Sequence, residues 1–153
     1  KRHLEAVREL VSVQKQSGIL AQVKIKMNEL DDVLHGVILV KERTPRTLDY
    51  IMSFGERISA YIISEAFKNQ GLAAAFLDAR KVIRTDANFG QAKVDFDVTN
   101  KLIQDHFKHQ TDVQIITGFI ATSESGETTT LGRSGSDYTA AIFAGANEYR
   151  RIG

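Results

Sequence analysis

A glycine-rich turn between an extended segment and a helix holds the residues best suited to chemistry. Residues 128–141 read TTTLGRSGSDYTAA. Such a turn gathers free backbone N–H groups at the positive end of a helix, where a carboxylate or phosphate can bind. Ser136 is suited to cap that helix and Asp137 to its first turn, while Arg133 offers a planar guanidinium that matches a carboxylate in two hydrogen bonds. Chemistry alone leaves two interpretations open, an anion site or a simple turn and cap.

Other titratable residues carry weaker patterns. His106 and His109 lie one helical turn apart, but no third ligand is near them, so a solvent-facing pair is favoured and no metal site is predicted. Glu56 falls near the expected start of a helix, where the helix dipole favours any carboxylate. The side chain of Phe119 is expected in the core, with only its backbone near a ligand.

Hydrophobic periodicity predicts helices alternating with short buried strands. Apolar residues at helical spacing from Leu4 to Leu34 predict a helical amino-terminal part, which we expect Gly18 to divide into two helices. Gly71 is expected to cap the third helix. The remaining expected elements are a charged connector at 41–46, helices at 48–68, 95–108 and 136–147, strands at 73–77 and 113–120, a loop at 84–93, and a polar connection or hairpin at 122–130. This order is typical of an α/β fold.

The composition excludes several classes of protein. Lys and Arg number 20 against 19 Asp and Glu, a net charge of +1 that argues against nucleic acid as a partner. The chain contains no cysteine, which excludes disulfides and thiolate zinc sites and fits a cytoplasmic location. Its apolar runs fall far short of the roughly 20 residues that span a bilayer, so no membrane segment is expected.

Three blocks of sequence resemble the aspartate kinases of the amino-acid kinase superfamily. Residues 130–141 (TLGRSGSDYTAA) are similar to the signature of that family, with Ser134 where many members have a third glycine. The other two blocks are 44–59, which contains TPRTLD and SFGERIS, and 78–90, which contains DARKVIRTD and FG. The blocks follow the family order and cover about residues 35–146. The resemblance implies a three-layer αβα, carbamate kinase-like domain.

The resemblance also implies a role for each matching residue. Glu56 would receive the α-ammonium of L-aspartate and Arg133 its α-carboxylate, while Phe119, Ser136 and Asp137 would form further walls of the same pocket. Asp137 would lie at the catalytic centre, and Gly132 and Gly135 would form the anion turn. A zwitterion held by one anion and one cation in this way would exclude analogues that lack either charge.

The implied reaction transfers the γ-phosphate of ATP to the β-carboxylate of aspartate, with Mg²⁺, in lysine, threonine and methionine biosynthesis. No catalytic base is needed, because that carboxylate ionises near a pKa of about 3.9 and is already the nucleophile. The resemblance further implies a homo-oligomer, and the same block order occurs in enzymes fused to homoserine dehydrogenase.

Parts of the family pattern do not occur in this sequence. It contains no Lys-Phe-Gly-Gly-type phosphate loop and no Trp-Thr-Asp-type nucleotide strand, and it begins at Lys1. We therefore expect residues 1–153 to be a single incomplete kinase domain, inactive by itself, from a longer enzyme. Two alternatives remain. One is a non-catalytic effector-binding or dimerisation module of the same fold, and the other is a different amino-acid kinase such as glutamate 5-kinase, which residues 53–56 (SFGE) and 132–137 (GRSGSD) disfavour.

Overall fold

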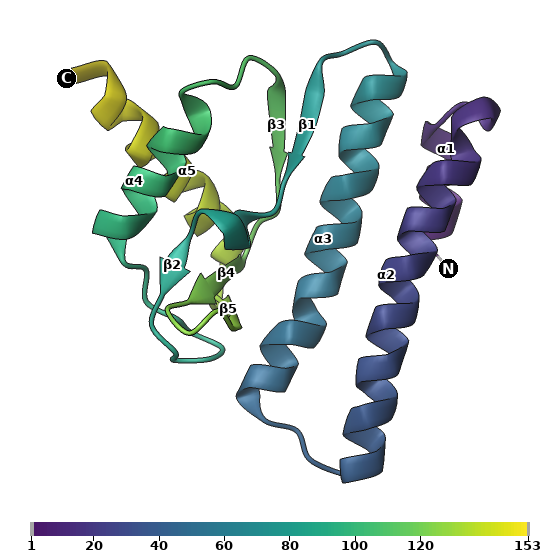
Figure 1. Ribbon diagram of the computed structural model, residues 1–153, viewed down its shortest axis with the longest axis horizontal. Coiled ribbons are helices and arrows are strands. Elements are labelled where there is room, and N and C mark those ends of the chain that lie inside the picture. Colours follow the sequence, from purple (N-terminus) through teal and green to yellow (C-terminus); the bar gives the residue numbers. More distant parts are fainter. Residues whose placement is uncertain (1, 153) are drawn as a thin grey trace.

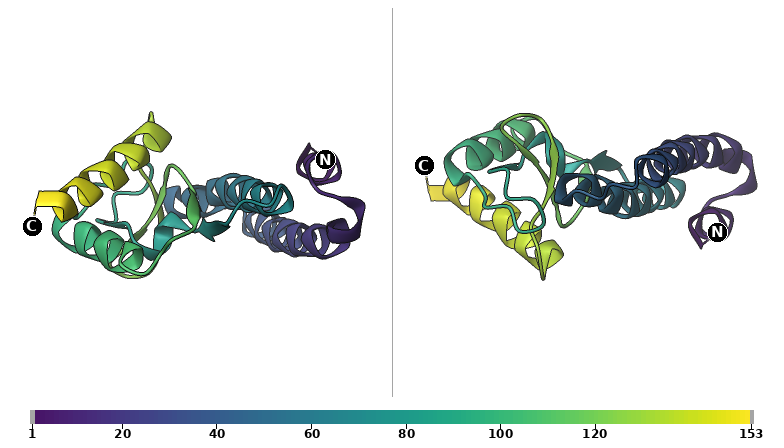
Figure 2. Two further views of the ribbon diagram at one scale, coloured as in Figure 1. Left: turned by 90° about the horizontal axis from the view of Figure 1, so that it is seen from above. Right: turned by 90° about the horizontal axis from the view of Figure 1, so that it is seen from below.

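Three helices form the amino-terminal half of the molecule. The computed structural model describes the backbone of residues 2–152 and the side chains of residues 2–148. Helix α1 spans Arg2–Leu10, α2 spans Val13–Val40 and α3 spans Pro45–Asn69. The two long helices run antiparallel, and α1 folds back beside them at the end of the molecule far from α4 and α5 (Figures 1 and 2).

The expected helix break at Gly18 is wrong. Gly18 lies inside α2, and the chain breaks instead at Val11 and Ser12. There the Asn69 side-chain oxygen accepts a hydrogen bond from the Ser12 backbone N–H at 3.2 Å, and Gln16 donates to the carbonyl of Val11 at 2.8 Å. A packed apolar cluster joins the three helices, formed by Val7, Val11, Ile19, Val23, Ile58 and Ile62.

Local sequence signals set both ends of α3. The Thr44 side chain accepts a hydrogen bond from the Thr47 N–H, and Pro45 occupies the first turn. Gly71 adopts φ +82° just beyond the helix, which confirms its predicted capping role. The helix begins three residues before the expected start at 48, because Thr44 and Pro45 supply a complete amino-terminal cap.

Two small sheets follow in the α/β half. Strand β1 (Ala74–Leu77) pairs in parallel with β3 (Val113–Ile116). Strand β4 (Ile120–Ser123) pairs in parallel with the two-residue β2 (Arg84–Thr85) and antiparallel with β5 (Thr128–Thr130). A 3₁₀ turn at Ala79–Lys81 lies between β1 and β2. The segment 84–93 is otherwise loop as predicted, and the polar connection after residue 122 is a hairpin.

The expected single strand at 113–120 is wrong, because the structure divides it into β3 and β4. Thr117 is fully buried, and its hydroxyl oxygen accepts a hydrogen bond from the Ala79 N–H at 2.8 Å. Phe119 then takes φ +69°, which redirects the chain from one sheet to the other. The run of β-branched residues predicted the strands, but it carried no sign of this tertiary hydrogen bond.

Helices α4 (Phe96–Phe107) and α5 (Gly135–Ile152) lie together beside the sheets (Figure 1). Asp95 caps α4 by accepting a hydrogen bond from the Val98 N–H. The second hydrophobic core lies between these helices and the strands and includes Leu77, Val82, Ile83, Ile103, Ala121, Leu131, Ile142 and Phe143. The α/β class with a helical amino-terminal part is thereby confirmed.

Candidate functional site

The Gly118–Phe119 turn lies directly against the start of α5. A Cβ atom at Gly118 would come within 2.7 Å of Ser136 Oγ, so only glycine allows this approach. The Phe119 N–H donates to the Thr139 hydroxyl at 3.0 Å, and that hydroxyl donates to the carbonyl of Gly135 at 2.9 Å. Thr139, which is 3% exposed, therefore holds the strained Phe119 backbone to α5.

The glycine-rich turn joins β5 to α5 beside the same segment. The Leu131 N–H donates to the carbonyl of Phe119 at 2.9 Å, and Gly132 follows with φ +78°. Ser134 also has positive φ, at +59°, and α5 begins at Gly135. The predicted capping role of Ser136 is therefore wrong. Ser136 lies within the first turn of the helix, because the chain already becomes helical at Gly135.

Arg133 lines a pocket of about 420 Å³ between this turn and α3, which we call the Arg133 pocket. Phe119 and Gly132 line it from the α/β half. Phe119 lines this pocket and is half-buried, so it is not fully enclosed in the core as expected. The other lining residues are Pro45, Leu48, Asp49, Met52, Gly90 and Thr130.

Glu56 lines a second pocket of about 340 Å³, which we call the Glu56 pocket. Ser136 and Gly118 line it with Glu56, and its other residues are Gln114, Ile116, Thr139, Ala140 and Phe143. Glu56 is half-buried and belongs to the interior of α3. Its expected position near a helix start is therefore wrong, and the helix dipole does not explain a carboxylate there.

The predicted site residues thus fall into two adjoining groups. Gly118 and Phe119 are consecutive but line different pockets, so the two pockets lie next to each other along α3. Gly135 lies at the boundary, where an added Cβ would come within 2.5 Å of the Phe119 ring. Asp137 is exposed on the first turn of α5 and lines neither pocket.

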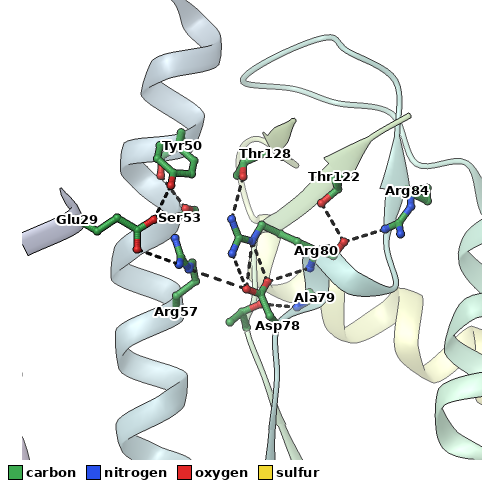
Figure 3. A network of polar contacts seen from close by, with 11 residues as sticks. Glu29, Tyr50, Ser53, Arg57, Asp78, Ala79, Arg80, Arg84, Thr122 and Thr128 are labelled. Carbon is green, nitrogen blue, oxygen red and sulfur yellow. Dashed lines mark hydrogen bonds and ion pairs between the residues drawn. The ribbon is translucent and has the colours of Figure 1, made fainter. Parts of the chain in front are cut away.

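A chain of charged side chains connects the long helices to the sheets (Figure 3). The guanidinium of Arg57 lies 3.7 Å from Glu29 of α2 and 3.9 Å from Asp78, which follows β1. Arg80 holds Asp78 at 2.7 Å and donates to Thr128 of β5 at 3.0 Å. Among the described residues, Arg57 Nη1 is buried without a hydrogen-bond partner. This network fixes α2, α3 and the sheets to one another.

The network also perturbs two titrations. Burial raises the pKa of Asp78, but the hydrogen bonds and charge of Arg80 outweigh it, with a contribution from Arg57, and the pKa lies below its usual value. The hydrogen bond from the Tyr50 hydroxyl to Glu29 raises the pKa of Tyr50, and burial raises it further.

Sequence reasoning missed two buried groups at the site. Asp49, 2% exposed, lies in the motif block 44–59 and Thr139, 3% exposed, lies in the motif block 130–141, but the motifs alone indicate no role for either side chain. A carboxylate on the apolar side of an amphipathic helix was the available signal for Asp49, because such a residue must find buried donors. For Thr139 no local signal existed.

Neither a metal nor a membrane feature appears in the part of the chain that the structure describes. No group of three or more His, Cys, Asp or Glu side chains is arranged to hold a metal ion among residues 2–148. The ring of His106 lies 3.0 Å from the side-chain oxygen of Gln114 instead. The helices within these residues are too short or too polar to cross a membrane.

Comparisons with known proteins agree on one family. Residues 3–152 match the model of the Amino acid kinase family. Lysine-sensitive aspartokinase 3 of Escherichia coli is 31% identical over 97% of this chain, and aspartokinase 1, chloroplastic, of Arabidopsis thaliana is 36% identical over 82%. The crystal structure of E. coli aspartokinase III in complex with aspartate and ADP superposes on 95% of this chain with a TM-score of 0.85 and 30% identity.

The chain spans 34% of the E. coli relative and 23% of the Arabidopsis relative, and it covers 34% of the chain in the crystal structure. The matched region nevertheless includes both pockets and every residue of the three motif blocks. The chain therefore belongs to the amino acid kinase family, and the relatives that it resembles are aspartokinases.

Proposed function

We propose that the protein is an aspartate kinase, which transfers the γ-phosphate of ATP to the β-carboxylate of L-aspartate and forms 4-phospho-L-aspartate. One observation carries the proposal. Glu56 from α3, Phe119 from the turn between β3 and β4, Arg133 from the glycine-rich turn and Ser136 from α5 line two adjoining pockets. Glu56 comes from one motif block and Arg133 and Ser136 from another, and both blocks resemble the same family. The E. coli relative whose structure contains aspartate and ADP supports the same substrate and nucleotide.

The charges of the two pockets suit a small amino acid with a second carboxylate. Arg133 would bind the α-carboxylate with two parallel hydrogen bonds, and Glu56 would accept hydrogen bonds from the α-ammonium. Ser136 would orient the side chain of the substrate, and Phe119 would form a wall of the pocket beside it. The β-carboxylate would then be free to attack the γ-phosphate in line, so catalysis consists of positioning and charge stabilisation.

ATP in cells is a complex with Mg²⁺, which takes one or two protein carboxylates when phosphates supply its other ligands. Asp137 is an exposed carboxylate beside the glycine-rich turn, so its chemistry fits this need. We assign to Asp137 the role of holding Mg²⁺, which would in turn bind the phosphates near Gly132 and Gly135. The metal would neutralise charge that develops on the transferred phosphoryl group.

We further propose that residues 1–153 are an incomplete kinase domain of a homo-oligomeric enzyme of amino-acid biosynthesis. The share of the curated relatives that the chain spans supports a longer parent. We also propose a cytoplasmic location, which fits the absence of cysteine from the sequence, although the Arabidopsis relative is chloroplastic by name.

The test is the reaction of the full-length protein with Mg²⁺ and ATP, measured as ADP release and as trapping of the acyl phosphate with hydroxylamine. We expect product with L-aspartate and far less with L-glutamate. Arg133→Ala should raise the KM for aspartate much more than the KM for ATP, because the bound substrate would cover Arg133 and losing one partner of such a covered charged pair costs about 2–5 kcal/mol. A preference for glutamate would indicate another amino-acid kinase, and absence of turnover would favour a non-catalytic module.

A further inference from the structure

We propose that Asp49 is a positioning residue for the Arg133 turn and sets the affinity for the amino-acid substrate; this inference rests on the proposed function. Asp49 lies in the first turns of α3 and is 2% exposed. It contributes to the lining of the Arg133 pocket, although it presents almost no surface to it. Its effect on a ligand must therefore act through the residues that it holds.

The Asp49 carboxylate accepts three hydrogen bonds from two segments that are distant in the sequence. One oxygen accepts the Gly90 N–H at 2.8 Å and the Thr130 N–H at 2.9 Å. The other oxygen accepts the Thr130 hydroxyl at 2.9 Å. The structure shows no ion pair of Asp49 with any described residue, so these donors alone compensate for its burial.

Both segments that Asp49 holds support the position of Arg133. Thr130 is the last residue of β5, and only Leu131 and Gly132 separate it from Arg133. Leu131 is hydrogen-bonded to the carbonyl of Phe119, and Gly132 has positive φ. On the other side, the carbonyl of Gly90 would lie only 3.3 Å from a Cβ atom at Gly132. The loop and the strand are also joined directly, since the Ala92 N–H donates to the carbonyl of Thr130 at 2.9 Å.

A single carboxylate on α3 therefore fixes the entry to the turn and the loop against which the turn rests. Arg133 itself is exposed, and no hydrogen bond from its guanidinium to another described residue holds it in place. Its direction depends on the backbone that carries it. Displacement of that backbone by a fraction of an ångström would misplace the guanidinium relative to the substrate carboxylate.

Four substitutions separate positioning from simple loss of stability. Asp49→Ala removes both carboxylate oxygens and with them all three hydrogen bonds. Asp49→Asn can still form three hydrogen bonds, since its amide oxygen can accept both N–H groups while the Thr130 hydroxyl rotates to accept from the amide nitrogen. Thr130→Val removes one hydroxyl at constant shape. Thr129→Val is the matched control, because Thr129 is equally buried on the same strand but bonds to Thr85 at 2.8 Å.

The measurement is the KM for aspartate and for ATP in the full-length protein, together with the melting temperature of each variant. We expect Asp49→Ala to raise the aspartate KM about tenfold or more, with the ATP KM changed less than about threefold. Thr130→Val should shift the aspartate KM in the same direction by a smaller factor. Asp49→Asn should restore most of the affinity, and Thr129→Val should lower stability without a selective effect.

The combination with Arg133→Ala gives the decisive comparison. If Asp49 acts through Arg133, then Asp49→Ala adds little to the aspartate KM once Arg133 is already alanine. Equal and independent effects of the two substitutions would overturn the inference, as would an unchanged aspartate KM in both Asp49→Ala and Thr130→Val. Should Asp49→Ala fail to fold, Thr130→Val against Thr129→Val decides alone. An unmodified protein that does not phosphorylate aspartate would instead overturn the proposed function.

Discussion

Gly118→Ala should lower stability, because its added methyl group would meet the start of α5. The new Cβ would lie 2.7 Å from Ser136 Oγ, 2.9 Å from Ser136 Cβ and 3.1 Å from Ser136 Cα. A different Ser136 rotamer relieves only the first contact, so the turn or the helix must shift. Gly118 does not have positive φ, which leaves the penalty purely steric. Overpacking of this kind costs about 1–3 kcal/mol.

For a chain of 153 residues, that loss corresponds to a fall in melting temperature of about 2–12 °C. Thermal and urea unfolding followed by circular dichroism would measure it. Gly145→Ala is the matched control on α5, since nothing lies within 4 Å of its added Cβ and helix propensity should stabilise it by about 0.5–1 kcal/mol. Adding Ser136→Gly to Gly118→Ala should recover part of the loss. A Gly118→Ala protein as stable as the unmodified one would contradict the close packing of this turn on α5.

Three further predictions concern charge and completeness. In the full-length protein, Glu56→Gln should weaken aspartate binding with little change in melting temperature, because Glu56 lines a pocket and lies in the middle of α3, away from the helix ends. Unchanged affinity for aspartate would show that Glu56 is not part of the site. Because the pKa of Asp78 is lowered in the folded protein, its ionised carboxylate stabilises the fold above pH 3.8, and this stabilisation is lost as the pH falls below that value. The difference in unfolding free energy between the unmodified protein and Asp78→Asn should therefore shrink in acid titrations. The 153-residue chain alone should show no aspartate-dependent ATP turnover above a heat-killed control, because its sequence contains no Lys-Phe-Gly-Gly-type phosphate loop.

The sequence predicted those elements whose limits are set by nearby residues. Asp95 caps α4 and Gly71 closes α3, and both signals lie within one turn of the helix end. The break near Ser12 could not be predicted in this way, because its partner Asn69 is 57 residues away. Gly18 does not mark the helix break, because a helix tolerates glycine at moderate cost. No close packing requires glycine at this position either, since nothing lies within 4 Å of a Cβ atom added there.

The site was predictable in its members but not in its arrangement. Family resemblance supplied Glu56, Phe119, Arg133 and Ser136, and the structure divides them between two pockets. The division occurs at Phe119, whose positive φ lies where β3 ends and β4 begins. The sequence does not indicate a positive φ at a non-glycine residue, because tertiary hydrogen bonds, such as that from Phe119 to Thr139, impose this conformation.

The hydrogen bonds of Asp49 to Thr130 close a loop of 81 residues, whereas α2 and α3 meet across a connection of only a few residues. On the logarithmic scaling of loop entropy, a closure of that length costs about 4 kcal/mol before any contact offsets it. The helical pair can therefore form early in folding, whereas the Arg133 pocket can form only after most of the chain has folded. Helices account for most of the ordered backbone. A preparation with a strong helical circular dichroism signal can consequently lack the pocket, and ligand binding is the measurement that reports on it.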